Sequence, residues 1–409
     1  MAEQKNSNML SSNVSRIIVV SVGHFLNDFY MNLIPPVLFV FAASLSLSMG
    51  QQGFIAFVIL GCGSFFQPLF GHMCDRGGKP IFLVCSLLWI AFWMSISGII
   101  TNYYLLVAAT GLGALASSLY HPLGSAVTIK LLQRAPNTSL ALFMTIGGLA
   151  ASVTPLVTLP LVNKFGLSSL ACFLVPGILA VFLMAAARLD QMKAISNEAD
   201  TADSPGEAVP AGPRKINFYS LKWLTALIAA AAIRVWISKG FIVFGAQFLA
   251  LKNVSLSMAG TLLTFFLLAT ALGTFWGGII TDIIGTKNMM VISFILATAG
   301  TLLMVVGSGF VAVVAFLLTS FFISTSNSSN ILLAHDIMPQ NETFATGMIM
   351  GLAGGVGALG IYLTGAMADA AGLLKAIAFL LIPLLIMSLL NIFLPKTTNS
   401  KPVNNTPVF

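Results

Sequence analysis

The sequence predicts an all-α membrane protein in which twelve transmembrane helices form two pseudo-symmetric halves of six helices each. Composition is the first reason: 57% of the residues are hydrophobic, 8% are charged and the mean hydropathy is +0.96, far outside the range of soluble globular domains. The second reason is a succession of apolar runs long enough to cross a bilayer. The third is a set of short sequences that occurs once in each half of the chain.

The apolar runs, divided at short polar breaks, predict the individual spans. The first six are expected at 16–43, 50–71, 80–100, 102–130, 138–162 and 167–188. The second six are expected at 220–250, 257–281, 288–308, 310–334, 343–368 and 373–394. The polar segment from Asp190 to Ser220 contains acidic residues, prolines and glycines, and its composition is typical of a flexible linker. We therefore divide the chain into an N-terminal half (1–189), a linker (190–219), a C-terminal half (220–395) and a tail (396–409).

Basic residues are distributed unevenly between the two sides that twelve spans define. With both chain ends on one side, that side collects most of the lysines and arginines, and the other collects only Lys164, Lys252 and Lys375. The positive-inside rule then predicts that both termini, the linker and the tail are cytoplasmic. The expected location is the bacterial inner membrane.

Two short patterns recur at equivalent places in the two halves. Ser46-Leu47-Ser48-Met49 precedes the second span, and Ser255-Leu256-Ser257-Met258 precedes the eighth. After these spans come Gly71-x-x-x-Asp75-x-x-Gly78-Lys79 and Gly278-x-x-x-Asp282-x-x-Gly285-x-Lys287. Parallel repeats of six spans are typical of transporters whose halves rock around a site between them.

Few titratable side chains lie deep in the predicted spans. They are His24, Asp28, His121, Arg234 and Lys239. His24 and Asp28 are four residues apart, so on a helix they share one face. A carboxylate at mid-membrane costs roughly 3 kcal/mol, and it is therefore expected to face a cavity or the protein interior. Aligning the halves places Asp28 at a depth between Arg234 and Lys239, so we expect it to pair with one of them across the cavity.

These groups suggest a proton site and a substrate site. We expect Asp28, assisted by His24, to take up and release protons, because histidine titrates near physiological pH. Lys239 or Arg234 would attract an anionic substrate; the alternative is a permanent ion pair that joins the first and seventh helices. His121 could serve substrate, proton or packing, and the polar run Ser324–Asn330 could line the cavity or pack helices. The expected substrate-binding residues are Asn27, Tyr30, Tyr120, His121, Arg234, Lys239, Asn327 and Asn330.

No metal or cofactor site is expected. The four cysteines lack C-x-x-C spacing, and neither His72 nor the pair His335-Asp336 has a set of partners at metal-ligand spacing. No Walker-type phosphate loop occurs.

The loop Gly71-His72-Met73-Cys74-Asp75-Arg76-Gly77-Gly78-Lys79 resembles the signature between the second and third helices of the major facilitator superfamily. The resemblance implies the fold of that superfamily and a latch at the cytoplasmic gate; the alternative is an ordinary tight turn. The residues expected to act in gating are Gly71, Asp75, Arg76, Gly78 and Asp282.

Further stretches resemble the fosmidomycin-resistance type of drug exporter within that superfamily. They are Gly23-His24-Phe25-Leu26-Asn27-Asp28, Gln67-Pro68, Tyr120-His121-Pro122, Ser238-Lys239 and the glycine series from Gly351 to Gly360. The chain departs from the pattern at Val107, where many antiporters carry arginine, and at Leu123, where this branch often has a polar residue.

The resulting prediction is a secondary transporter, a proton-coupled exporter of a small polar or anionic compound such as an antibiotic or metabolite. The alternatives are an importer of an anionic nutrient with the same fold, a membrane-embedded enzyme and a sensor that has lost transport. The expected partners are a small-molecule substrate, protons and membrane lipids. Nucleic acid is not expected, because the net charge of +7 is spread over short loops. The protein is expected to be a monomer.

Overall fold

The computed structural model describes residues 2–131, 136–189, 192, 195–196, 218–338, 345 and 348–395. Its first half contains α1 (Ala2–Met31), η1 (Pro35–Val37), α2 (Leu38–Leu45), α3 (Met49–Phe65), α4 (Gln67–Asp75), β1 (Arg76–Gly78), α5 (Ile81–Ile96), η2 (Ser97–Ile99), α6 (Tyr103–Leu131), α7 (Pro136–Phe165), η3 (Leu167–Phe173) and α8 (Leu174–Ala186). β2 (Ile195–Ser196) follows. The second half contains α9 (Phe218–Leu251), α10 (Leu256–Ile284), α11 (Thr286–Val306), α12 (Gly309–Ser324), α13 (Asn327–Ile337), η5 (Met348–Leu352), α15 (Ala353–Ala371), α16 (Leu373–Phe379) and α17 (Leu381–Asn391).

The twelve predicted spans are confirmed. Among the described residues, 12 helical segments are long and apolar enough to cross a membrane, from Ser15–Leu45 to Leu373–Asn391. The predicted limits agree closely with these segments, because the short polar breaks in the sequence coincide with the turns. The fifth span was expected at 138–162, and it lies within α7, which runs from Pro136 to Phe165.

Several spans are interrupted helices: the second is divided into α3 and α4 at Phe66, and the twelfth into α16 and α17 at Leu380. Two further interruptions lie in the first and tenth spans. In the first, α1 ends at Met31, and the chain turns before η1 and α2 complete the crossing. Pro35 and Pro36 explain this break, since proline has no N–H to donate within a helix. In the tenth, α12 ends at Ser324 and α13 begins at Asn327. This break falls inside the polar run that was expected to line the cavity.

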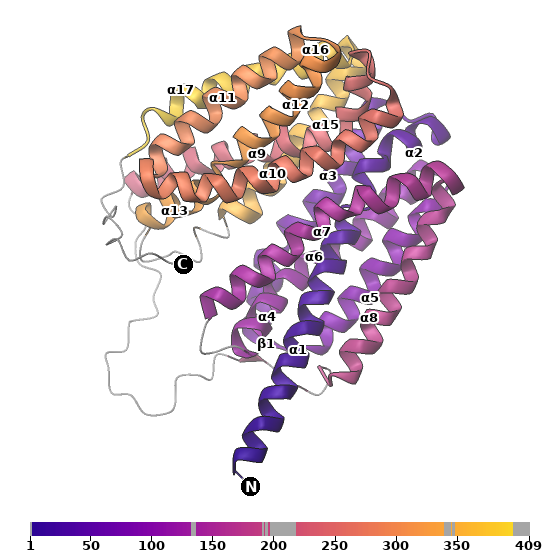
Figure 1. Cartoon of the computed structure of the whole chain (residues 1–409), viewed down its shortest axis with the longest axis vertical. Coiled ribbons are helices and arrows are strands. Elements are labelled where there is room, and N and C mark those ends of the chain that lie inside the picture. Colours follow the sequence, from indigo (N-terminus) through magenta and orange to yellow (C-terminus); the bar gives the residue numbers. More distant parts are fainter. Residues whose placement is uncertain are drawn as a thin grey trace.

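The helices form two bundles that meet along a limited set of helices (Figure 1). Helices α1, α5, α6, α7 and α8 pack against one another in the first bundle, and α9 to α13 with α17 do so in the second. Across the boundary, α3 packs against α15, and α7 packs against α10. The boundaries of the halves, the linker and the tail remain predictions, and most of 190–219 and all of 396–409 lie outside the described residues.

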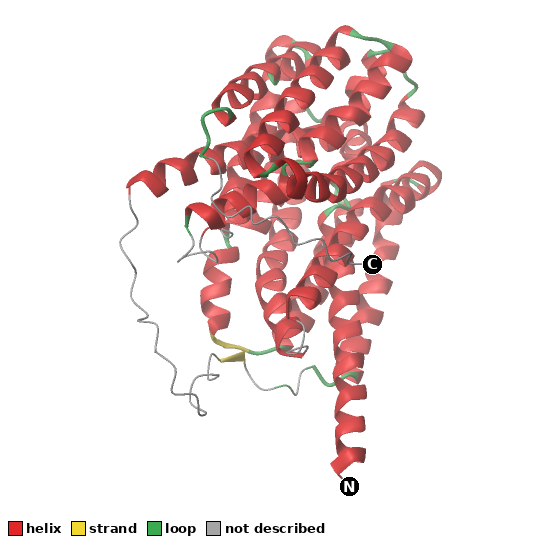
Figure 2. Cartoon of the chain, turned by 60° about the vertical axis from the view of Figure 1, so that its left-hand side comes forward, coloured by secondary structure: helices red, strands yellow, loops and turns green. Residues whose placement is uncertain are grey.

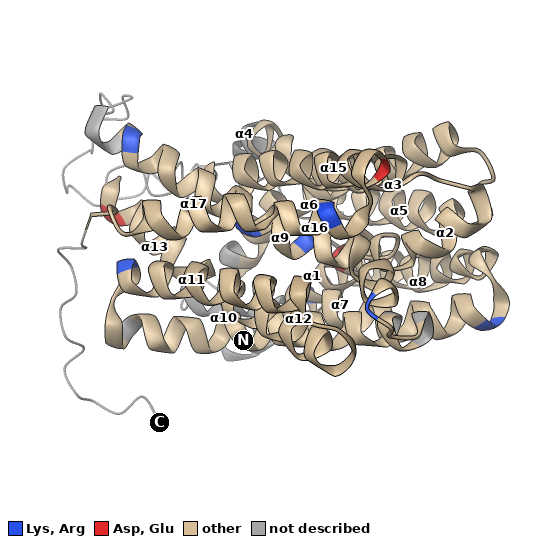
Figure 3. Cartoon of the chain, turned by 90° about the horizontal axis from the view of Figure 1, so that it is seen from above, with Lys and Arg blue, Asp and Glu red and all other residues tan. Residues whose placement is uncertain are grey.

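Polar and apolar side chains are distributed as lipid requires. Large apolar residues such as Phe182 and Phe310 are 67% and 81% exposed, whereas His24 and Asn27 are 1% and 0% exposed. Along most of every helix, acidic and basic residues are absent from the ribbon (Figure 3). The few charged groups that remain inside are therefore costly to keep there, which makes them candidates for function.

A small antiparallel sheet joins a short part of the segment between the halves to the first half. β2 pairs with β1, with Arg76 opposite Ser196 and Gly78 opposite Ile195. The strands lie at the end of the first bundle near α4 (Figure 2). Part of the segment between the halves is thus hydrogen-bonded to the loop predicted to act in gating.

Candidate functional site

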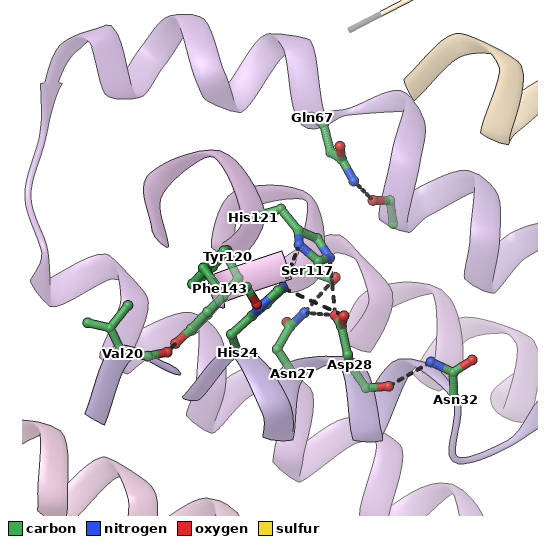
Figure 4. Close-up of polar contacts among 11 residues, drawn as sticks. Val20, His24, Asn27, Asp28, Asn32, Gln67, Ser117, Tyr120, His121 and Phe143 are labelled. Carbon is green, nitrogen blue, oxygen red and sulfur yellow. Dashed lines mark hydrogen bonds and ion pairs between the residues drawn. The ribbon is translucent and has the colours of Figure 1, made fainter. Parts of the chain in front are cut away.

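Three titratable side chains from α1 and α6 form one cluster (Figure 4). His121 Nε2 lies 3.2 Å from Asp28 Oδ1, and His24 Nε2 lies 3.6 Å from Asp28 Oδ2. The two imidazoles also contact each other, with His24 Nε2 and His121 Nδ1 3.2 Å apart. Asp28 and His121 are 19% and 26% exposed, whereas His24 is 1% exposed. The sequence spacing of His24 and Asp28 therefore predicted neighbours, and His121 joins them from another helix.

The ring of His24 is held by α7. Its Nδ1 lies 2.7 Å from the backbone carbonyl oxygen of Phe143. The two rings are stacked, with centroids 3.7 Å apart and planes inclined by 4°. Because a carbonyl can only accept, Nδ1 of His24 must carry a proton, and its Nε2 faces His121 and Asp28.

Asn27 connects the cluster to α6. Its Nδ2 donates to Asp28 Oδ1 at 3.0 Å and to Ser117 Oγ at 2.9 Å. The Asn27 side chain is fully buried, and its Oδ1 has no hydrogen-bond partner among the described residues. Asn27 therefore orients the carboxylate of Asp28 rather than facing open space.

The three contacts from Phe143 to Asp28 require three protons. They are Phe143 O to His24 Nδ1, His24 Nε2 to His121 Nδ1, and His121 Nε2 to Asp28 Oδ1. Two neutral imidazoles carry only two N–H groups, so the third proton makes one ring cationic or makes Asp28 a neutral acid. The geometry is thus that of a cluster holding one extra proton, with a net charge of zero.

The same three side chains bring ligand-type atoms within 4.8 Å of one another, which is close enough for one divalent cation. However, His121 directs both ring nitrogens at protein groups. A metal-bound histidine gives one nitrogen to the ion and the other to an orienting partner. The hydrogen-bond chain accounts for both nitrogens of His121, so the contacts fit a proton site better than a metal site.

The expected pairing of Asp28 with a cation of the seventh span is not what the described side chains show. The ion-pair partners of Asp28 are the two histidines. The histidines neutralise the carboxylate within its own half, so the direct pair with Arg234 or Lys239 is not formed among the described residues. The alternative of a permanent salt bridge between the first and seventh helices is not seen there either.

Lys239 reaches Asp28 through an intermediary, Asn32. Lys239 Nζ donates to Asn32 Oδ1 over 3.5 Å, and Asn32 Nδ2 donates to the backbone carbonyl of Asp28 at 2.8 Å. Asn32 lies where α1 ends, so the break in the first span supplies the side chain that joins the two halves at this depth. Arg234 is placed differently: its Nε is buried without a hydrogen-bond partner among the described residues.

The two tyrosines expected to contact substrate are packed inside the first half. Tyr30 is fully buried, and its hydroxyl donates to Phe173 O at 2.6 Å. Tyr120 is also fully buried and donates to Val20 O at 3.0 Å, with its ring parallel to that of His24. Tyr120 therefore packs against His24 of the cluster, whereas the hydroxyl of Tyr30 contacts Phe173 instead.

Most of the polar side chains in the run Ser324–Asn330 are buried between helices, although we expected part of this run to line the cavity. Ser324, Thr325 and Ser326 are buried and donate to backbone carbonyls within the same segment. Asn330 is 1% exposed and donates to Leu227 O at 3.2 Å. Asn327, which is partly exposed at the start of α13, remains the better candidate for contact with a cavity.

The predicted gating residues are placed only in part. Gly71 and Asp75 belong to α4, Arg76 and Gly78 to β1, and Asp282 to α10. The side chains of Asp75, Arg76 and Asp282 lie outside what the structure describes. Their gating role remains a prediction.

Sequence reasoning missed four contributors: Asn32, Ser117, Phe143 and Gly147. Asn32 and Ser117 are common neutral residues. Placing them in the membrane costs much less free energy than placing a carboxylate there, so nothing in the sequence singled them out as it did Asp28. Phe143 acts through a carbonyl that every residue possesses. Gly147 matters because it has no side chain: a Cβ there would lie 2.4 Å from Asp28 Oδ2.

Comparison with known proteins gives a consistent picture. The family model of the Major Facilitator Superfamily matches residues 20–251 and 227–408. An uncharacterized MFS-type transporter, YfnC of Bacillus subtilis (strain 168), is 27% identical over 89% of this chain and 90% of its own length. The fosmidomycin resistance protein of Escherichia coli (strain K12) is 24% identical over 92% of this chain and 91% of its own length.

Solved structures share the fold at low sequence identity. An inward-facing, unoccupied bacterial homologue of the human lysosomal transporter Spinster has a TM-score of 0.76 and 14% identity over 93% of this chain and 96% of its own. The nucleoside transporter NupG has a TM-score of 0.75 and 13% identity over 93% of this chain and 100% of its own. Together with the twelve spans, the family match makes this chain a multi-pass membrane protein and a member of the major facilitator superfamily.

Proposed function

We propose that this protein is a proton-coupled exporter of a small polar or anionic compound in the bacterial inner membrane. Both termini are proposed to be cytoplasmic, and transport is proposed to occur by alternating access of the two halves. The proton is carried by the cluster of Asp28, His24 and His121. Lys239 and Arg234 provide the positive charge that favours an anionic substrate.

The observation that carries this proposal is the chain of contacts from Phe143 to Asp28, which needs one proton more than two neutral histidines supply. Loss of that proton leaves one contact with two acceptors facing each other, and the chain must open there. Protonation and local geometry are therefore linked, as a coupling site requires.

Export, rather than uptake, is supported by similarity to the fosmidomycin resistance protein at 24% identity. The same cluster would also serve proton-driven uptake of an anion, so the direction of transport is part of the test. A screen of anionic antibiotics, beginning with fosmidomycin, identifies a compound to which expression of the protein raises the resistance of a bacterial host.

The coupling test uses that compound in proteoliposomes. Uphill accumulation driven by an imposed proton gradient is compared with exchange of labelled for unlabelled compound when no gradient is present. Asp28→Asn and His121→Gln remove the extra proton site but leave neutral polar groups, so both variants should retain exchange and lose gradient-driven accumulation. His335→Gln, a histidine of α13 outside the cluster, is the matched control and should retain both activities.

Two results would contradict the proposal. One is gradient-driven transport in Asp28→Asn that equals the unmodified protein, because the cluster would then have no part in coupling. The other is accumulation in the sense of symport, which would make the protein an importer.

A further inference from the structure

We propose that a pocket between the two halves takes a small amphiphilic anion, whose head group contacts Lys239 and whose apolar body lies against α3, α9 and α15. This inference builds on the proposed transport function, since it names the substrate class of the same protein. It concerns a different place from the proton cluster, because none of the three cluster side chains lines this pocket.

The pocket is formed by both halves. Ten residues line it, and eight of the ten are apolar. Its apolar walls come from Pro35, Ile59, Leu60, Ile242, Val243 and Ile361. The two polar lining residues are Asn32 and Lys239. A mostly apolar cavity with few convergent polar groups is the usual form of a small-molecule site.

Lys239 has unused hydrogen-bonding capacity in this pocket. An ammonium group has three donors. Among the described residues, Lys239 makes one hydrogen bond, the 3.5 Å contact with Asn32 Oδ1. No acidic residue lines the pocket. The strongest partner for such a group is an anion, which forms a charge-assisted hydrogen bond at shorter distance.

The lining restricts the class of ligand further. A cation would meet the like charge of Lys239, and a sugar would leave most of its hydroxyls facing apolar walls without partners. An inorganic anion has no apolar part, so it would leave the apolar lining residues without a contact. A compound with one anionic head and a short apolar body satisfies both parts of the pocket.

Asn32 connects this pocket to the proton cluster. Its Oδ1 accepts from Lys239, while its Nδ2 donates to the carbonyl of Asp28 at 2.8 Å. An anion that draws Lys239 toward itself removes the partner of Asn32 Oδ1. Binding in the pocket therefore changes the contacts at the end of α1, close to Asp28. Asn32 is the positioning residue through which this effect passes.

The test measures the charge preference of the pocket directly and needs neither a known substrate nor a proton gradient. The native cysteines Cys62, Cys74, Cys85 and Cys172 are replaced, and single cysteines are placed at Leu60 or Met31, two lining residues that are partly exposed. The purified protein in nanodiscs is treated with an anionic methanethiosulfonate (2-sulfonatoethyl) or a cationic one (2-trimethylammonioethyl). Reaction rates are compared in the presence and absence of hexanoate, hexylammonium or acetate.

The anionic reagent should react about tenfold faster than the cationic one, after correction for their rates with a free thiol. Lys239→Gln should abolish this preference, and Lys239→Arg should retain it, which separates the loss of charge from a folding defect. Lys222→Gln removes an exposed positive charge on the same helix, α9, away from the lining residues, and should leave the preference in place. Hexanoate should slow labelling, whereas hexylammonium and acetate should not.

Equal rates for the two reagents, or protection by hexylammonium as strong as by hexanoate, would overturn the proposal. So would an absence of reaction at both cysteine positions, since the pocket would then be closed to small solutes. Because labelling involves no transport, a protein without proton coupling can still show the preference, and a coupled transporter can lack it.

Discussion

At the scale of single residues, the proton cluster depends on the absence of a side chain at Gly147. A Cβ at this position would lie 2.4 Å from Asp28 Oδ2 and 2.5 Å from His24 Cε1. The adjacent Gly148 has nothing within 4 Å of its Cβ position. A side chain at Gly147 would therefore collide with the cluster, whereas a side chain at the neighbouring Gly148 would not.

Gly147→Ala is expected to reduce gradient-driven transport by about tenfold or more, because the methyl group must displace Asp28 or His24 from the hydrogen-bond chain. Gly148→Ala should leave transport within about twofold of the unmodified protein, since a helical alanine is readily accommodated. Transport rates in proteoliposomes, normalised to the amount of folded protein, measure both. Equal loss in the two variants would indicate a general effect on α7 rather than on the cluster.

How far these residues could be predicted depended on their chemistry. His24, Asp28 and His121 were found from the sequence because titratable groups in lipid are expensive and rare. Their grouping was only half predicted: the helical spacing placed His24 beside Asp28, but the partner of Asp28 was expected on the seventh span. The approach of α6 and α7 decided otherwise, and helix approach is a property of packing that no local pattern encodes.

At the scale of helices, the two halves are joined by the contact of α3 with α15. Asp369 of α15 accepts three hydrogen bonds of 2.7 Å at the start of α3, from Ser48 Oγ and from the backbone N–H groups of Met49 and Gly50. An anion is favoured at a helix N-terminus by the dipole and by the unpaired N–H groups. The two helices can approach this closely because Gly365 has no side chain. A Cβ at this position would lie 2.2 Å from the Met49 carbonyl oxygen and would push the helices apart.

Asp369→Asn is expected to weaken the closed contact at this end, because the amide replaces a charged acceptor and cannot accept all three bonds equally well. Spin labels on the exposed residues Ser44 and Lys375, one in each half, should report a larger population of longer distances. An unchanged distance distribution would show that packing alone holds α3 against α15.

The repeated Ser-Leu-Ser-Met sequence provides a matched control for this contact. Ser48 and Ser255 are both N-cap residues, of α3 and α10. Loss of either cap should cost about 1 kcal/mol of helix stability. Only Ser48 also donates to a residue of the other half. Ser48→Ala should therefore lengthen the distances between the spin labels, and Ser255→Ala should not.

At the scale of the whole molecule, the sequence predicted the architecture more completely than the site. Twelve spans and their order follow from hydropathy, because lipid demands long apolar helices with satisfied backbones. The interruptions at Asn32 and after Ser324, and the pairing of β2 with β1, were not expected. The pairing of Arg76 with Ser196 depends on contact between segments distant in sequence. The break at Asn32, in contrast, precedes Pro35 and Pro36, which are local features of the sequence.

The orientation of the molecule in the membrane decides on which side the two halves are held together by Asp369. Hydrogen bonds between the halves include those of Asp369, of the pair Gln52–Gln247 and of the pair Asn32–Lys239. The positive-inside rule predicts that the Asp369 end faces outward. In that orientation, the structure is a state in which the halves are hydrogen-bonded on the outer side.

Two neutral residues at opposite ends of α11 test this orientation. Both are exposed: Asn288 lies in the first turn of the helix Thr286–Val306, and Ser308 lies just after its end. In a cysteine-free background, Ser308→Cys should react with a membrane-impermeant maleimide in intact cells, whereas Asn288→Cys should react only after the membrane is permeabilised. Neither substitution alters a charge, so the topology signal is preserved. The reverse pattern would place both termini outside, and Asp369 would then hold the halves together on the cytoplasmic side.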